Sequence, residues 1–275
     1  MFFKICPFVL LGIFFLQCKM VPKEKLSQWN QPVAYTVAND TLKIEVSNIL
    51  NCPLRMDAAS KQKEIQELLT IDFPRVLTPG LDTIFRYPTR LQKQDLKLSF
   101  NFTMGDPNTP VADTVLQLPF PKGKSFRIVQ GYNGKFSHRT DYSRYALDFN
   151  LQPGDTIAAA ASGYVVGVIS GYKHGGNNKK WRDYANFITI YHPHLNLFTQ
   201  YVHLKYEGSL VAVGDAVSTG QPIGLAGKTG FTSTPHLHFN ALRATDDGMS
   251  SVRITFAEGY VGSSLKEGDR VLNPK

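Results

Sequence analysis

Short runs of alternating apolar and polar residues, separated by turn residues, make up most of this chain. The clearest runs are residues 42–46 and 96–102, in which every second side chain is apolar. Alternation with a period of two places the apolar side chains on one face of a strand. Residues 60–69 have helical spacing, but this segment is short, and no long helical period occurs after residue 125. The sequence therefore predicts a mostly β protein.

Two β-rich modules are predicted. Residues 19–118 form the first, whose simplest assembly is a small β-sandwich, with a turn at Asn39-Asp40 between two strands. Two prolines and a glycine mark residues 119–130 as a linker that leads into the first strand of the second module. The second module covers residues 131–245, and residues 246–275 are predicted to be an extension that packs on it.

Turn residues within the second module predict how its strands pair. Residues 187–191 and 197–204 are expected to form a hairpin across the polar segment between them. Residues 210–213 and 222–225 are expected to form another pair around Gly214-Asp215.

The first 18 residues have the character of a signal peptide. One lysine precedes an apolar run over residues 5–16, which is too short for a comfortable membrane span. The run ends at Cys18, which is predicted to be lipidated, although Gln17 replaces the small residue usual before such a cysteine. We therefore expect export to the cell envelope (periplasm or cell surface), with a lipid at Cys18 as membrane anchor. Simple secretion and an uncleaved anchor are the alternatives.

Charge and cysteine content limit the partners and the covalent bonds that we expect for this chain. Lys and Arg outnumber Asp and Glu by 30 to 22, but no basic stripe or recognition motif accompanies the excess, so nucleic acid is not expected as a partner. The net charge of +8 suits a polyanionic envelope polymer or a lipid surface. Cys52 is the one cysteine beyond residue 18, so an internal disulfide is not expected and Cys52 is predicted to be a core residue.

The segment Pro235-His236-Leu237-His238-Phe239 carries the strongest chemical signal. On a strand, His236 and His238 share one face while Leu237 and Phe239 point into a core. Imidazole is the commonest metal ligand in proteins, and two imidazoles on one strand are preorganised donors. Because a single H-x-H pair also occurs by chance, the interpretation depends on further ligands elsewhere in the chain.

His138 and Asp148 are the candidates for those ligands. Asp148 lies between apolar residues on an expected strand, where an unpaired carboxylate would be costly and a metal would remove the cost. A capping or salt-bridged aspartate is the alternative. Catalytic Zn²⁺ takes three protein ligands and keeps one position for water, whose pKa it lowers to about 7. His138, Asp148 and His238 would supply such a set.

His203 lies in an apolar run, Gln200-Tyr201-Val202-His203-Leu204. Taken alone, it is best interpreted as a buried structural histidine. With His236 it would complete a pair of imidazoles that stand beside a metal without binding it. Such groups polarise an attacking water or stabilise an oxyanion and a leaving amine.

The ordered set of motifs between residues 131 and 242 resembles the lysostaphin/LytM-type zinc metallopeptidases, which have a duplicated hybrid motif fold and cut peptide bonds in bacterial peptidoglycan. The resemblance rests on these segments: Ser137-His138, residues 145–149, 154–160, 161–165, 201–204, 213–217, 220–224 and 230–239. It implies an open groove and zinc held by His138, Asp148 and His238. It also implies that His203 and His236 are the catalytic histidines.

The spacing of the first two ligands departs from many members of that family. They place the aspartate four residues after the histidine, whereas ten positions separate His138 from Asp148. Asp141 therefore competes with Asp148 for the ligand role. We favour Asp148, because Asp141 lies in a polar loop segment. The second H-x-H pair, His192 and His194, contains Pro193, so we expect these two histidines to be exposed in a turn.

Together these features predict an exported zinc metalloendopeptidase whose substrates are peptidoglycan peptides, hydrolysed by metal-activated water with the help of His203 and His236. The first alternative is a non-catalytic family member that acts as activator or scaffold for another cell-wall hydrolase. A lipoyl- or biotinyl-carrier domain is the second, because residues 213–217 and 220–224 resemble that hairpin family. A carrier, however, has no need of a histidine cluster.

Overall fold

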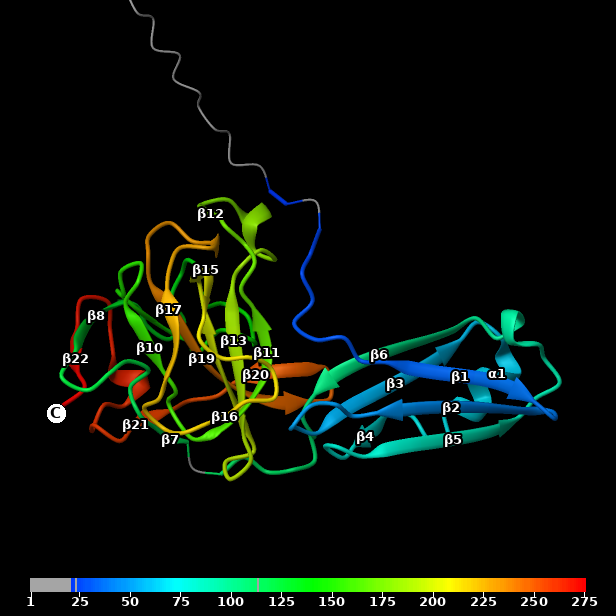
Figure 1. The fold of residues 1–275 in the computed structure, drawn as a ribbon. Coiled ribbons are helices and arrows are strands. Elements are labelled where there is room, and N and C mark those ends of the chain that lie inside the picture. Colours follow the sequence, from blue (N-terminus) through cyan, green and yellow to red (C-terminus); the bar gives the residue numbers. More distant parts are fainter. Residues whose placement is uncertain (1–20, 23, 113) are drawn as a thin grey trace, which may run out of the picture.

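The structure is a computed structural model that describes residues 21–22, 24–112 and 114–275. The predicted signal peptide and Cys18 lie outside this part of the chain. The described residues are mostly β-strand and form two modules that lie side by side (Figure 1). In this part of the chain, no helix has both the length and the apolar character needed to span a membrane.

The N-terminal module consists of two antiparallel sheets that share one core. The first sheet has the order β1 (Val33–Ala38), β2 (Thr41–Ser47) and β5 (Asp82–Pro88), and the second has β4 (Arg75–Leu77), β3 (Leu54–Ser60) and β6 (Leu98–Met104). Alternate apolar side chains of both sheets meet in this core, together with one face of the short helix α1 (Lys63–Leu69). A single-turn 3-10 helix, η1 (Lys93–Asp95), precedes β6.

The hairpin of β1 and β2 turns at Asn39 and Asp40, as predicted. Both residues have left-handed backbone angles, with φ values of 48° and 53°. A two-residue hairpin loop needs this conformation at both positions, and Asn and Asp adopt it more readily than most residues. The turn fixes the register, so that Leu42, Ile44 and Val46 all face the core.

The C-terminal module is built on a nine-stranded sheet that carries the candidate site. Its order is β16 (Ala216–Val217), β11 (Gly163–Ile169), β13 (Phe187–His192), β14 (Leu197–Val202), β19 (Leu237–Thr245), β9 (Leu147–Phe149), β8 (Ser125–Gln130) and β22 (Arg270–Leu272), and β20 (Gly248–Ser251) pairs with β19. The strand that begins at Leu237 and bears His238 is therefore near the centre of the sheet, and His236 immediately precedes it. Leu237 and Phe239 are fully buried in the main core, as the alternation predicted.

Three smaller sheets complete this module. They are β10 (Thr156–Ala158) with β17 (Pro222–Ala226) and β15 (Leu204–Ser209), β12 (Gly175–Gly176) with β18 (Gly230–Phe231), and β21 (Thr255–Phe256) with β7 (Val115–Leu116). The pairs β7–β21 and β8–β22 join the start of the module to its C-terminal end. Two 3-10 helices, η2 (Lys179–Trp181) and η3 (Gly262–Ser264), lie in its connections.

One predicted strand pair is confirmed and one is wrong. Strands β13 and β14 form the expected antiparallel hairpin. Residues 210–213, however, form no strand, and β17 pairs with β10 and β15 instead. The turn at Gly214-Asp215 packs along β11, where Gly214 N donates to Val165 O and Val165 N donates to Asp215 O. The local pairing is thus kept by the segment just before, where Ser209 of β15 pairs with Gly224 and Leu210 N donates to Ile223 O, while the turn bonds the distant strand β11.

The two modules share an apolar interface. Leu50, Cys52, Leu54 and Met104 of the first module pack against four residues of the second, namely Val166, Tyr191, Phe198 and Leu242. The guanidinium of Arg55 donates to the carbonyls of Thr245 and Asp246, at 2.8 and 2.7 Å. Cys52 is buried, so its prediction as a core residue is confirmed.

Candidate metal and catalytic site

Strand pairing brings Asp148 and His238 together. In the antiparallel register of β9 and β19 they stand directly opposite each other. Leu147 and Phe149 point from the other face of β9 into the core, which leaves the Asp148 side chain beside the histidines. Asp148 is only 3% exposed. The prediction that an apolar-flanked strand carries this carboxylate is confirmed.

His138 reaches the same point because the loop between β8 and β9 folds back on itself. Asn133 N donates to Arg144 O across the loop, and His138 N donates to Gly134 O. The hydroxyl of Ser143 donates to the carbonyl of Ser137, which closes the far side of the loop. The ten-residue spacing between His138 and Asp148 is therefore spanned by an ordered, hydrogen-bonded loop.

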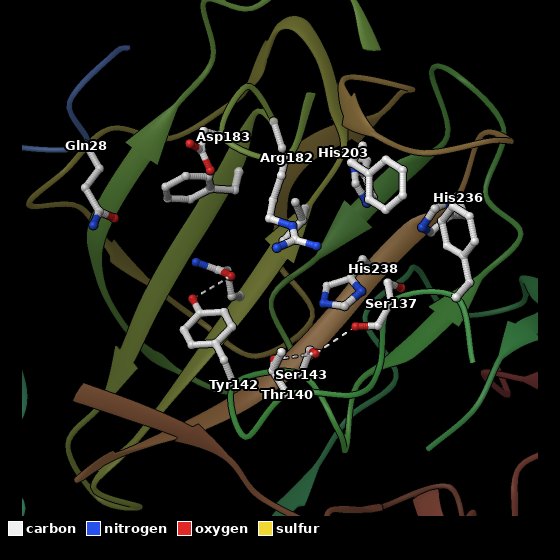
Figure 2. Close-up of a pocket in the computed structure, with 16 residues that line it drawn as sticks. Gln28, Ser137, Thr140, Tyr142, Ser143, Arg182, Asp183, His203, His236 and His238 are labelled. Carbon is white, nitrogen blue, oxygen red and sulfur yellow. Dashed lines mark hydrogen bonds between the residues drawn. The ribbon is translucent and has the colours of Figure 1, made fainter. Parts of the chain in front are cut away.

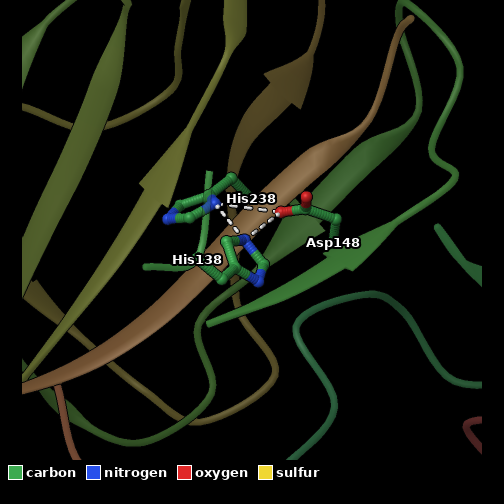
Figure 3. Close-up of side chains that lie close together, drawn as sticks. All are labelled: His138, Asp148 and His238. Carbon is green, nitrogen blue, oxygen red and sulfur yellow. Dashed lines mark hydrogen bonds and ion pairs between the residues drawn. The ribbon is translucent and has the colours of Figure 1, made fainter. Parts of the chain in front are cut away.

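Three potential ligand atoms converge (Figure 3). His138 Nε2 lies 3.2 Å from Asp148 Oδ1 and 3.2 Å from His238 Nδ1, and His238 Nδ1 lies 2.9 Å from Asp148 Oδ1. Ligands about 2.0–2.1 Å from a tetrahedral Zn²⁺ lie about 3.3 Å from one another, so the triangle matches one face of such a site. His236 Nε2 is farther from the carboxylate, at 3.7 Å.

The hydrogen bonds of His138 favour a cation at this point. Its Nδ1 lies 2.8 Å from the carbonyl oxygen of Gly131. A carbonyl can only accept, so Nδ1 carries the proton and Nε2 of the neutral ring presents a lone pair to the carboxylate. A proton or a metal ion must separate these two acceptors. Two imidazole nitrogens and one carboxylate oxygen are a donor set that suits Zn²⁺.

Electrostatics keep Asp148 ionised. Burial by itself would raise its pKa, but in the metal-free site the positive charge of the protonated forms of His236 and His138, with hydrogen bonds to His138 and His238, outweighs burial and holds the pKa well below its ordinary value. The second carboxylate oxygen, Oδ2, accepts a hydrogen bond of 3.0 Å from the Gln130 amide, which directs Oδ1 toward the histidines. Gln130 also donates to the Ser137 hydroxyl and accepts from Phe136 N, so its own position is fixed.

His203 and His236 lie beside the triangle without belonging to it. Each holds Nδ1 against a backbone carbonyl, His203 at 2.7 Å from Thr229 O and His236 at 2.9 Å from Thr234 O. The proton on each ring is therefore at Nδ1, and Nε2 is a bare acceptor. Burial, followed by the charges of His236 and His238, lowers the pKa of His203 well below its ordinary value. His203 is thus a neutral ring whose Nε2 carries no proton.

A groove of about 520 Å³ opens beside the histidines (Figure 2). His203, His236 and His238 line it, together with polar side chains of the β8–β9 loop such as Tyr142. Sequence reasoning missed Tyr142, whose hydroxyl donates to Gln200 Oε1 at 2.9 Å. It also missed Gln28 and Arg182, which line the groove from distant segments and have no local motif.

Asp141 and the pair His192 and His194 were not expected to bind the metal, and the structure places them in different surroundings. Asp141 lies outside the cluster, is exposed and pairs with Arg144, as the choice of Asp148 implies. The expectation that His192 and His194 are both exposed is wrong for His192, which is 1% exposed. His192 ends strand β13, where its Nδ1 donates to Ser162 O and its Nε2 bonds the Thr199 hydroxyl. Pro193 ends the strand one residue later than we expected, and only His194 is exposed.

Comparison with known proteins agrees with the geometry. The family model described as peptidase family M23 matches residues 142–250. An uncharacterized metalloprotease of Buchnera aphidicola is 30% identical over 132 residues, which cover 47% of this chain and 32% of the relative. The peptidoglycan DD-endopeptidase ShyB of Vibrio cholerae is 32% identical over 127 residues, which cover 45% of this chain and 27% of ShyB. This chain thus spans about a third or less of the length of either relative.

Among solved structures, the catalytic domain of lysostaphin from Staphylococcus simulans is 25% identical and aligns with a TM-score of 0.34, over 46% of this chain and 87% of that domain. The family match contains His203, His236 and His238 and begins after His138, whose place in the cluster rests on the loop geometry alone. The resemblance predicted from the motifs is confirmed, and residues 142–250 form a peptidase family M23 domain.

Proposed function

We propose that this protein is a zinc-dependent endopeptidase that hydrolyses peptide bonds in bacterial cell-wall peptidoglycan. The observation that carries the proposal is the convergence of His138 Nε2, Asp148 Oδ1 and His238 Nδ1 at one end of a groove lined by two further histidines. Membership of the M23 peptidases and the similarity to a peptidoglycan DD-endopeptidase support the substrate class.

His138, Asp148 and His238 would hold the zinc ion. When bound, zinc polarises the scissile carbonyl and makes water acidic enough to lose a proton near neutral pH. His203 would accept the proton of the attacking water at its bare Nε2 and deliver it to the leaving amine as the C–N bond breaks. His236, held at Thr234 O, would orient the same water or the developing oxyanion.

The decisive experiment pairs zinc content with peptide hydrolysis. Purified protein should contain one zinc per chain and release new amino groups from isolated peptidoglycan. A chelator should abolish the release, and added Zn²⁺ should restore it. Stoichiometric zinc without any release of amino groups would contradict the enzymatic proposal and favour the non-catalytic activator or scaffold.

We further propose that the protein is exported and held at a membrane by a lipid on Cys18. The apolar run and the cysteine that ends it support this proposal. Fractionation of cells that express Cys18→Ser should move the protein from the membrane fraction to the soluble envelope fraction. Unchanged membrane association of this variant would contradict the lipid anchor and favour an uncleaved apolar one.

A further inference from the structure

We propose that Arg182 binds a free carboxylate of the peptide substrate and so makes the groove selective for acidic peptides. The inference rests on the proposed function, because it concerns the substrate of the same groove. It does not involve the metal ligands or the two catalytic histidines.

Arg182 is the cation of the groove. Sixteen residues line the groove. If its histidines are set aside, only Arg182 and Asp183 among them carry a full charge at neutral pH. Figure 2 shows the Arg182 guanidinium directed into the groove, between the end marked by Gln28 and the end marked by His236. A peptide that occupies the groove would therefore pass this guanidinium.

Asp183 does not neutralise Arg182, because it is engaged elsewhere. Its carboxylate forms an ion pair with Lys25, from the segment that precedes the N-terminal module. That segment is held in place by a second contact, in which Leu26 N donates to the Tyr172 hydroxyl at 2.6 Å. No carboxylate among the described residues forms an ion pair with Arg182, so its charge is available to a ligand.

The backbone around Arg182 is anchored, which makes it a defined recognition point. Arg182 follows η2, and Arg182 N donates to Lys179 O at 3.1 Å. The preceding Trp181 is buried and packs edge-on against Tyr184. The buried indole and this backbone hydrogen bond anchor the turn from which the Arg182 side chain extends. Arginine binds carboxylates through two parallel N–H···O bonds, a geometry that lysine cannot reproduce.

Several other side chains that line the groove are neutral and polar, which suits an extended peptide. Thr140, Tyr142, Ser143 and Gln200 are neutral hydrogen-bonding side chains along the groove. They can bond a peptide backbone but cannot balance a positive charge. Arg182 therefore gives this part of the groove its preference for anions, while the neutral residues accept peptides of varied sequence.

The test compares soluble peptidoglycan peptides before and after chemical amidation of their carboxylates. Binding is measured by calorimetry and hydrolysis by the release of amino groups. The wild-type protein should bind the untreated peptides about tenfold more tightly, which is the contribution expected of a charge-assisted hydrogen bond. Arg182→Ala should lose this preference through a raised KM with little change in kcat, and Arg182→Lys should retain part of it.

Lys180→Ala is the matched control, because it removes the same charge from the same turn at a side chain that does not line the groove. It should keep the wild-type preference. Equal binding of both peptide forms by the wild-type protein would overturn the proposal, as would an Arg182→Ala variant that still discriminates. If binding discriminates but no amino groups are released, the Arg182 proposal stands and the endopeptidase proposal fails.

Discussion

The ring of His203 packs edge-on against the ring of His236, with the two centroids 4.6 Å apart, and each ring holds its Nδ1 against a backbone carbonyl. Neither ring belongs to the triangle of His138, Asp148 and His238. This arrangement assigns metal binding and proton transfer to different histidines. In the proposed mechanism the triangle would hold the metal, and the pair would move protons without binding it.

His203→Ala should therefore leave zinc content unchanged while turnover falls about 10²- to 10⁴-fold. His203 has a left-handed backbone with φ of 71°, so His203→Asn is the companion variant that tolerates this conformation best. Zinc content by mass spectrometry, the melting temperature and amino-group release check the prediction. Full activity in either folded, zinc-loaded variant would remove His203 from the mechanism.

Asp148→Asn should weaken zinc binding, because it removes the negative charge at one corner of the triangle. Asp141→Asn removes the same charge from the loop that precedes β9, and its exposed side chain pairs only with Arg144. The control should therefore keep wild-type zinc affinity and lose at most about 1 kcal/mol of stability. Competition with a chromophoric chelator measures both affinities. Equal losses in the two variants would show that the ligand is misassigned.

Gln130→Ala should lower zinc affinity about ten- to a hundredfold, although Gln130 is not itself a ligand. Its amide holds Asp148 Oδ2 at 3.0 Å, and without it the carboxylate is free to rotate. Gly134→Ala offers an independent route to the same effect, since a Cβ there would lie 2.2 Å from Gln130 Cγ. If zinc affinity survives in both variants, β9 alone positions the carboxylate.

His192 should make the fold sensitive to acid. Burial lowers the pKa of His192 from 6.5 to about 4, so below pH 6.5 the unfolded chain binds a proton that the folded chain refuses. The stability is complete above the unfolded pKa and declines as the pH falls toward the folded one. The slope is about 1.4 kcal/mol per pH unit, or about 3 kcal/mol over the whole interval.

Urea unfolding of the wild type and of His192→Gln at several pH values tests this effect. The variant should be less stable near neutral pH, because it loses buried hydrogen bonds, and the difference between the two proteins should shrink as the pH falls from 6.5 toward 4. The exposed His194 supplies the control, His194→Gln, which removes a neighbouring histidine that is not buried. A constant gap for His192→Gln would mean that the pKa of His192 is the same in the folded and the unfolded protein.

Local patterns predicted the features that depend on local geometry. Alternation located β2 and β6, the Asn39-Asp40 turn fixed a register, and His236-Leu237-His238 gave the direction of the side chains at the start of β19. Each of these follows from the period of a single strand. Local patterns could not place Asp148 beside His238, because their contact depends on the pairing of β9 with β19. Only the family resemblance predicted that contact.

Features that depend on distant segments could not be predicted. Residues 210–213 have the composition of a strand, but the neighbouring turn bonds β11, which is more than forty positions earlier in the chain. His192 is buried because Thr199 and Ser162, from two other segments, satisfy both of its nitrogens. Gln130 and Arg182 likewise acquire their surroundings only from the tertiary fold.

The apolar interface between the modules has a consequence for how the protein can be divided. Val166, Tyr191, Phe198 and Leu242 belong to the peptidase domain, but their cover is supplied by Leu50, Cys52, Leu54 and Met104. A peptidase domain expressed without the first hundred residues would present this patch to water and would be prone to self-association. Conversely, heating should melt the intact protein in one cooperative transition, since neither module keeps its full core when the other unfolds. The N-terminal module is thus the cover of an apolar face that the C-terminal module cannot bury by itself.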